Sequence, residues 1–488
     1  MTTLDGYARI RSMHDIGFLF EPSSVAIVGA SSDPQSNTNV NFLQPLLQFG
    51  YRGRVYPVNP SVSEIMGLQA YAGICDIPEP VDYAICAIPV TSTPQLIREC
   101  VAKKVKAVAL FTAGFSETGE DEGTRIEKEV VEIARRGGVR VLGPNCMGIH
   151  CPKAGLSLDA SIPRESGHVS FLSQSGGNSQ DIILGLAERR VFMSKLVSYG
   201  NAADLNEADF LEYFADDGDT CIIGAYVEGV KQPQRFLRVL REAVRSKPVI
   251  VVKGGTTEAG SGAVSLHTGA LAGSTATWDA FCKQAGVIQG RDLGEMTDAI
   301  QAFSHLKPPR GRRVGIVGVG GGANVLAADE CESTGLVVPV LPTDVRGELR
   351  MFTPAAGTGL RNPVDTLTSI YLEPDVLART VRVVAGWDGV DFLFVVFPTL
   401  LGVRLGVQCL KDGVEAVVDV AKSIDKPLAF ILRTANCAEG ESIAWDVQGQ
   451  CCASGFPVFW SPAEAARAMD HLITYYENRL AWNAFEPA

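Results

Sequence analysis

The sequence lacks the features that would place the protein in a membrane or on a nucleic acid. No stretch approaches about 18 unbroken apolar residues, and the first twenty residues carry acidic side chains without an apolar central segment. No run of lysine and arginine alternates with aromatic residues, and the net charge is −12. We therefore expect a cytoplasmic protein without a membrane or nucleic-acid partner.

The spacing of the cysteine and histidine residues does not indicate a metal site. The twelve cysteines form no CxxC pair and no cluster with histidine at metal-site spacing. We predict reduced, mostly buried thiols and no metal site. The GxxxxGK[ST] loop of P-loop nucleotide sites is also missing.

Three apolar runs that end in glycine are present: "SVAIVGASS" (24–32), "HVSFLSQSGG" (168–177) and "RVGIVGVGGG" (313–322). Each precedes a plausible helix, and the three runs are nearly evenly spaced. A chain of 488 residues exceeds one core, since domains average about 150 residues. The fold class predicted is α/β, with three consecutive doubly wound domains.

Further apolar segments fill in each predicted sheet. Strands are expected at 54–60, 81–89, 105–115 and 139–145 in the first unit, at 169–173, 222–227 and 249–253 in the second, and at 314–318, 391–397 and 427–432 in the third. "LKPPRGRR" (306–313) is the best linker candidate. Residues 461–480 predict a helix with Ser461 as N-cap.

The glycine loops do not favour NAD. "GASSDP" has a single glycine, and the second strand ends in Val58, Asn59 and Pro60, where a dinucleotide site needs an acidic residue. "GVGGGA" (318–323) fits GxGxxA, but no acidic residue closes the next plausible strand. We interpret it as a tight turn between strand and helix.

"SQSGG" (173–177) is a strand-to-helix loop suited to an anion. Backbone N–H groups and the positive end of the helix dipole favour a phosphate at Ser175, Gly176 and Gly177. A serine-hydrolase interpretation carries little weight because the GxSxG spacing is missing.

His267 stands in a segment, 254–274, that contains six glycines and no proline. A permissive backbone suits a side chain that visits more than one place, and imidazole can accept and release a phosphoryl group. The other five histidines have no polar constellation beside them in sequence. Glu228, just past a predicted strand, is a candidate to orient the imidazole, although a surface acid at a strand end is an equal alternative.

Together these segments resemble the NDP-forming acyl-CoA synthetases, the superfamily that includes succinyl-CoA synthetase. "FEPSSVAIVGAS", "YRGRVYPVNP" and "LGPNCMGI" resemble its CoA-binding domain, "LSQSGG", "YVEGV" and "HTGALAGS" its phosphohistidine domain, and "GGGANVLAADECESTGL" its C-terminal ligase domain. The resemblance implies a Rossmann-like CoA-binding domain at 1–150 and two flavodoxin-like ligase domains at 151–308 and 309–488.

The resemblance also assigns roles. His267 is implied to be the phosphorylated residue, Glu228 its supporting acid, and residues 175–177 one of two helix starts that hold the phosphoryl group. The implied CoA-binding residues are Gly29, Ser31, Val58, Asn59, Ile88, Pro89 and Asn145.

Two departures from the family concern CoA. Many relatives carry a lysine after the Asn-Pro that ends the second strand, where this chain has Ser61. Either the affinity for CoA is lower, or another cation such as Arg52 or Arg54 makes the missing phosphate contact. Asn37 and Thr38 stand where a glycine is common.

The implied reaction joins a carboxylic acid to coenzyme A through an acyl phosphate, with ATP or GTP and Mg²⁺ regenerating phosphohistidine on an ATP-grasp module. The three units leave no room for that module, so we expect an α-type subunit that pairs with a separate β-type subunit in a heterotetramer containing a dimer of this chain. Two alternatives stay open: a nucleotide-independent acyl or carbamoyl transferase, and a non-catalytic sensor of CoA or acyl-CoA.

Overall fold

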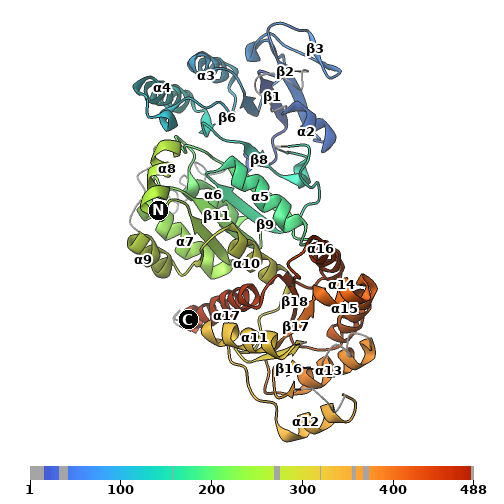
Figure 1. Cartoon of the computed structure of the whole chain (residues 1–488). Coiled ribbons are helices and arrows are strands. Elements are labelled where there is room, and N and C mark those ends of the chain that lie inside the picture. Colours follow the sequence, from blue (N-terminus) through green and yellow to red (C-terminus); the bar gives the residue numbers. More distant parts are fainter. Residues whose placement is uncertain are drawn as a thin grey trace. The chain divides into compact units, whose positions relative to one another are not determined.

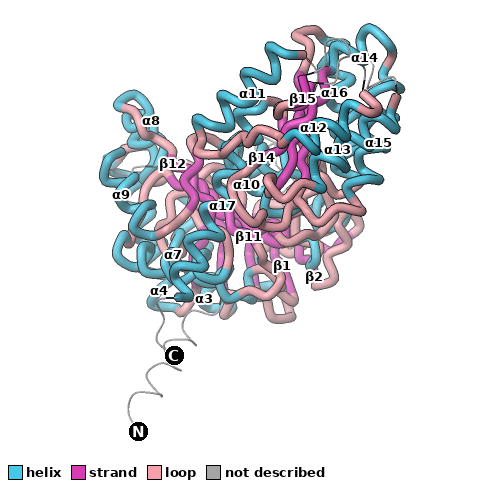
Figure 2. The backbone as a smooth tube through the Cα atoms, turned by 90° about the horizontal axis from the view of Figure 1, so that it is seen from below, coloured by secondary structure: helices cyan, strands magenta, loops and turns pink. Residues whose placement is uncertain are grey.

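The computed structural model describes residues 16–31, 42–157, 159–268, 275–318, 320–353, 359–365 and 373–484, and leaves out the side chains of 265–268, 483 and 484. The chain divides into two compact units. One comprises Met1–Leu184 with Phe192–Leu293, and the other Gly185–Val191 with Gly294–Ala488. Figure 1 shows the elements in chain order, and Figure 2 shows strands enclosed by helices.

The first sheet has five parallel strands in the order β2-β1-β5-β6-β7. They are β1 (Ser24–Val28), β2 (Arg54–Val58), β5 (Tyr83–Cys86), β6 (Ala107–Leu110) and β7 (Arg140–Leu142), with helices α2 (Leu43–Gln48), α3 (Thr93–Lys103) and α4 (Asp121–Gly137) and the hairpin β3 (Glu64–Ile65), β4 (Leu68–Gln69). Every residue of β1 is buried, as expected of an inner parallel strand. In α4, the buried Ile126, Val130 and Ala134 recur every four residues and form the face that meets the core.

The second sheet has six strands in the order β13-β12-β11-β9-β10-β8, all parallel except β8. They are β8 (Gly148–His150), β9 (Val169–Ser173), β10 (Met193–Ser198), β11 (Ile222–Val227), β12 (Val249–Lys253) and β13 (Ile288–Gly290). Its helices are α5 (Gly176–Ala187), α6 (Glu207–Asp216), α7 (Pro233–Ser246), α8 (Glu258–Thr268) and α9 (Thr275–Ala285). Thus β8, which precedes the predicted domain boundary at 150, belongs to the second sheet.

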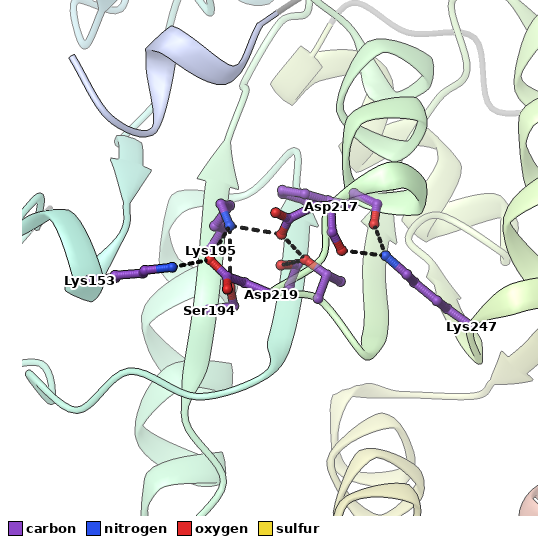
Figure 3. Close-up of polar contacts among 9 residues, drawn as sticks. Lys153, Ser194, Lys195, Asp217, Asp219 and Lys247 are labelled. Atoms are coloured by element: carbon purple, nitrogen blue, oxygen red, sulfur yellow. Dashed lines mark hydrogen bonds and ion pairs between the residues drawn. The ribbon is translucent and has the colours of Figure 1, made fainter.

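Strand β10 is missing from the sequence prediction because its buried residues include Ser194, Lys195 and Ser198. Lys195 is only 3% exposed, and its Nζ lies 2.8 Å from Asp217 Oδ2 and 3.6 Å from Asp219 Oδ2. Figure 3 shows both carboxylates beside this ammonium group. A buried charge is tolerated when it is paired, and the partners come from a distant loop that periodicity cannot reveal.

The third sheet has six strands in the order β15-β16-β14-β17-β18-β19, with only β15 antiparallel. They are β14 (Val314–Gly318), β15 (Gly359–Leu360), β16 (Val364–Asp365), β17 (Phe392–Pro398), β18 (Leu428–Arg433) and β19 (Val458–Phe459). Its helices are α10 (Leu293–His305), α11 (Gly321–Ser333), α12 (Thr343–Arg350), α13 (Pro374–Gly386), α14 (Thr399–Leu405), α15 (Val407–Ala421), α16 (Ala438–Ala453) and α17 (Pro462–Ala484). The α/β class with mainly parallel sheets is confirmed.

The predicted linker at 306–313 lies inside the compact unit that contains Gly294–Ala488, and ion pairs hold it in place. Arg312 Nη1 lies 2.6 Å from Asp470 of α17, and Arg313 Nη2 lies 2.8 Å from Asp391. The helix before it, α10, shares a hydrophobic core with β14. Residues 306–313 therefore join two packed elements, while the domain boundary at 308 stays a prediction.

The final helix starts as predicted, because Ser461 Oγ accepts the N–H of Glu464 at 3.2 Å. Among the described helices, none combines the length and apolar character needed to cross a membrane.

Candidate active site

The first sheet has a topological switch point at β1, which has β2 on one side and β5 on the other. In such sheets, ligands bind in the crevice beyond the carboxyl ends of the strands. The carboxyl ends of these three strands and the loops that follow them carry six of the seven predicted CoA residues: Gly29, Ser31, Val58, Asn59, Ile88 and Pro89. The structure thus brings these residues to one edge of the sheet.

Gly29 occupies a position that a larger residue would not tolerate. Its φ is +87°, its N–H donates to Val58 O at 3.1 Å, and an added Cβ would lie 2.5 Å from Ala87 O. The left-handed backbone and the close approach both require glycine. The loop after β1 is therefore clamped between the ends of β2 and β5.

Asn59 uses its side chain to shape the same edge. Its Nδ2 donates to Ala30 O at 2.9 Å, and its Oδ1 accepts the N–H of Ser61 at 2.8 Å. The amide thereby joins the loop after β1 to the turn after β2. This residue positions the backbone around the crevice.

The expectation that Arg52 or Arg54 could replace the family's lysine is wrong on geometric grounds. Arg54 begins β2 and pairs with Glu79 at 3.6 Å, whereas Ser61 follows the end of the same strand. A five-residue strand separates its two ends by roughly 13 Å at about 3.3 Å per residue. Both arginines lie toward the amino edge, away from the crevice.

Asn145 follows β7, at the far edge of the first sheet, and is linked to the crevice through Thr112. Its N–H donates to Thr112 O at 3.0 Å, and Thr112 Oγ1 donates to Ile88 O at 2.6 Å. Thr112 opens the segment "TAGFSETG" but was not predicted as a site residue, because its hydrogen bond to Ile88 forms only in the folded sheet.

The second sheet has its switch point at β9, between β10 and β11. Ser175, Gly176 and Gly177 follow β9, and Glu228 follows β11, so the structure brings the predicted phosphate-binding and acidic residues to one edge. Ser175 Oγ caps helix α5 by accepting the N–H of Asn178 at 3.3 Å. The N–H groups of both glycines begin the helix, where no preceding helical carbonyl can reach them. Such a helix start can hold an anion.

Glu228 is 5% exposed, so the alternative of a surface acid at a strand end is wrong. Tyr226 Oη donates to Glu228 Oε1 at 3.3 Å. Burial, together with the nearby charge of Glu228, raises the pKa of Tyr226 to about 12. Tyr226 therefore stays a hydrogen-bond donor to this carboxylate at physiological pH.

A glycine pair after β12 joins Glu228 to the helix that carries His267. A Cβ on Gly254 would lie 3.2 Å from Glu228 Cγ, and one on Gly255 (φ +73°) would lie 2.7 Å from Val264 Cγ2 of α8. Position 267 follows Val264 by one turn of α8, and its side chain lies outside the described residues. The six glycines of 254–274 indicated a permissive backbone and did not predict helix α8.

Helix α8 also contacts the first-sheet loop "TAGFSETG" at its short helix η4 (Ser116–Thr118). Asn201, in the loop after β10, reinforces this junction. Its Nδ2 donates to Glu117 Oε2 at 2.6 Å and to Glu127 Oε2 at 3.0 Å. The first and second sheets are therefore linked close to the helix that carries His267.

The third glycine loop has the contacts of a tight turn. A Cβ on Gly318 would lie 2.9 Å from Asn324 Oδ1 and 3.0 Å from Val396 Cβ. Gly320 N–H donates to Asp365 Oδ1 at 3.2 Å. These contacts agree with close packing of strand and helix at "GVGGGA".

All twelve cysteines are free, most of them buried, as predicted. The described residues contain no group of three or more histidine, cysteine, aspartate or glutamate side chains that could hold a metal ion.

Comparison with known proteins gives matches along the chain. Residues 23–152 match the CoA binding domain model, and residues 166–303 match the succinyl-CoA ligase like flavodoxin domain model. The α subunit of ADP-forming acetate–CoA ligase II from Pyrococcus furiosus is 35% identical over 467 residues, which cover 95% of this chain and 98% of that protein.

Longer relatives and a solved structure match as well. ADP-forming acetate–CoA ligase I of Archaeoglobus fulgidus is 35% identical, and the match covers 94% of this chain but 63% of that protein. The structure of acetyl-coenzyme A synthetase 1 from Candidatus Korarchaeum cryptofilum, in complex with phosphate and ADP, has a TM-score of 0.83 at 30% identity and covers 97% of this chain and 100% of its own. The chain therefore belongs to the NDP-forming acyl-CoA synthetase family.

Proposed function

We propose that the chain is the α-type subunit of an NDP-forming acyl-CoA synthetase. It interconverts a carboxylic acid, coenzyme A and a nucleoside triphosphate with acyl-CoA, nucleoside diphosphate and phosphate. The observation that carries this proposal is the near end-to-end similarity to the Pyrococcus furiosus α subunit, which covers 98% of that protein. The gathering of the predicted site residues at the carboxyl ends of strands in the first two sheets supports it.

The reaction divides into three balanced transfers. A ring nitrogen of His267 attacks the γ-phosphorus of the triphosphate, so that an N–P bond forms and the diphosphate leaves. A carboxylate oxygen of the acid then attacks that phosphorus and releases the imidazole as acyl phosphate forms. The sulfur of coenzyme A, having given up its proton, attacks the acyl carbon and phosphate departs.

The second sheet's edge is suited to the first two transfers. The N–H groups at the start of α5 would hold the phosphoryl oxygens, with charge-assisted hydrogen bonds of about 1.5–3 kcal/mol each. The buried carboxylate of Glu228 would orient the imidazole and stabilise its charged form. Coenzyme A would occupy the first sheet's crevice at Gly29, Ser31, Val58, Asn59, Ile88, Pro89 and Asn145.

The nucleotide belongs to a partner in this proposal. A β-type ATP-grasp subunit would bind ATP or GTP with Mg²⁺, and two copies of each subunit would form a heterotetramer in the cytoplasm. The name of the Pyrococcus furiosus relative, a subunit alpha, supports a partner chain. The Archaeoglobus fulgidus relative, of which this chain matches 63%, supports a fused counterpart of that partner.

The transferase and sensor alternatives are not favoured, because the relatives are named as ADP-forming ligases. A direct test incubates the full chain and its β-type partner with γ-labelled ATP. Wild type should gain acid-labile label on this chain and His267→Asn should gain none. Equal labelling of the two would disprove the phosphohistidine assignment. A panel of carboxylic acids, assayed for thioester formation, would then identify the substrate.

A further inference from the structure

The loop that carries Glu228 is held by side chains from three other elements. Gln174, at the end of β9, accepts two backbone N–H groups with one oxygen: that of Glu228, through a short bond, and that of Gly229 at 2.8 Å. Gln174 is 2% exposed. An amide this deeply buried adds stability only while its hydrogen bonds are made.

A second contact comes from the first residue of α6. Glu207 is fully buried, and its Oε1 accepts the N–H of Lys231 at 2.7 Å. Burial raises the pKa of this carboxyl group. An acid at this depth, bonded to backbone N–H, costs desolvation energy that a surface helix start would avoid.

The third contact comes from the end of β12. Lys253 Nζ donates to Glu228 O at 2.7 Å and, through a short bond, to Gly254 O. Side chains from β9, α6 and β12 therefore form hydrogen bonds with both N–H and C=O groups of the backbone of residues 228–231. Each element ends or begins at the carboxyl edge of the second sheet, where ligands bind.

We propose that Gln174, Glu207 and Lys253 are positioning residues for histidine phosphorylation, because they fix the backbone of residues 228–231 and thereby the carboxylate of Glu228. This inference rests on the proposed function. The three side chains act through Glu228, so their loss should misplace that carboxylate. A displacement of about 1 Å can cost on the order of 10²-fold in rate.

The test is a mutant cycle on the complex of this chain with its β-type partner, with the initial rate of labelling from ATP as the readout. Gln174→Ala should lower that rate about 10- to 100-fold and leave the Kd for coenzyme A unchanged. In a Glu228→Ala background, Gln174→Ala should cost nothing more, because the residue through which it acts is gone. Additive losses, or a parallel loss of coenzyme A binding, would overturn the proposal in favour of a general structural role.

Conservative variants sharpen the test. Glu207→Gln and Lys253→Arg keep an acceptor and a donor and should retain most of the rate, whereas Glu207→Ala and Lys253→Met should not. Gln289→Ala is the matched control, since the Gln289 amide donates to Asp279 at 2.8 Å on another element. Equal loss in the conservative and truncating variants would contradict the backbone-holding role.

A second readout does not depend on catalysis. Hydrogen exchange of the peptide spanning 226–232 should be at least 10-fold faster in Gln174→Ala and Glu207→Ala than in wild type, with the Gln289→Ala control unchanged. Unchanged exchange would overturn the inference. If wild type takes no label at all, the proposed function is wrong, and exchange still decides whether these side chains hold the loop.

Discussion

The first and second sheets each have a central strand, β1 or β9, flanked on both sides, and each gathers loops at the carboxyl end of that strand. In the first crevice the loops are shaped by backbone geometry, with Gly29 at φ +87° and the Asn59 amide bonded to its neighbours. In the second, the buried polar side chains of Gln174 and Glu228 directly follow β9 and β11, at the edge where helix α5 begins. The same strand arrangement is thus shaped mainly by backbone geometry at one sheet edge and by buried polar side chains at the other.

The sequence segments that follow β1, β2 and β5 (29–42, 59–82 and 87–92) contain no lysine or arginine. A phosphorylated ligand in the first crevice must therefore rely on backbone N–H groups, with cations from elsewhere in the assembly. At the second sheet's edge, helix N–H groups are combined with the half-buried ammonium donor Lys253. The difference predicts that variants in the two crevices fail in different assays.

The largest effect is expected from Glu228→Gln. The substitution keeps the shape but removes the charge that would stabilise a charged imidazole, so the rate of His267 labelling should fall about 10²- to 10³-fold. Rapid-quench measurement of acid-labile phosphate checks this rate. A fall of less than threefold would show that the charge of Glu228 does not contribute to phosphorylation of His267.

Gly29→Ala should come next, acting on the other crevice. A Cβ only 2.5 Å from Ala87 O forces the loop to move, and a positive φ costs a non-glycine residue about 1–3 kcal/mol. We expect the Kd for coenzyme A to rise at least 10-fold in calorimetric titration. An unchanged Kd would place the ligand away from β1.

Ser61→Lys should raise the affinity of the first crevice for coenzyme A, because it adds a cation where the chain has none. One exposed charge pair contributes up to about 1 kcal/mol, so the affinity for coenzyme A should rise by up to about fivefold and the gain should shrink at high salt. Arg54→Gln is the control and should have no effect, since it lies at the other end of β2. A gain that is insensitive to salt would argue against a phosphate contact.

The smallest effect is expected from Tyr226→Phe. The variant removes a hydrogen bond to Glu228 that, at 3.3 Å, is longer than the usual O–H···O range of about 2.5–3.0 Å, so labelling should slow only two- to fivefold. A larger loss would make Tyr226 a principal partner of the carboxylate.

The sequence allowed prediction of those elements whose cause is local. Strands such as β1 and β12 are continuous apolar runs, and a buried parallel strand requires that pattern. Strand β8 escaped prediction because it is short and follows a loop, and β10 because Lys195 is neutralised by distant aspartates. The spacing of apolar residues in a sequence cannot reveal ion-pair partners that come close only when the chain folds.

The residues of the candidate site also fall into two groups, those with a local sequence signal and those whose role depends on the tertiary fold. The strand-end positions of Gly29, Gly176 and Glu228 could be predicted, because each residue lies in a motif that follows an apolar run. Gln174 stands inside one of those motifs, yet its role depends on the loop after β11, which reaches it only through the sheet. The burial of Glu228 is likewise a tertiary property, so the sequence left its surface alternative open.

The most direct measurement of the central claim is a crossed comparison of Gly29→Ala and Glu228→Gln. Both variants, purified with the β-type partner, are assayed for coenzyme A affinity and for His267 labelling from ATP. We predict that Gly29→Ala loses coenzyme A affinity and keeps labelling, and that Glu228→Gln loses labelling and keeps affinity. Loss of both properties in both variants would contradict the separation of the two crevices.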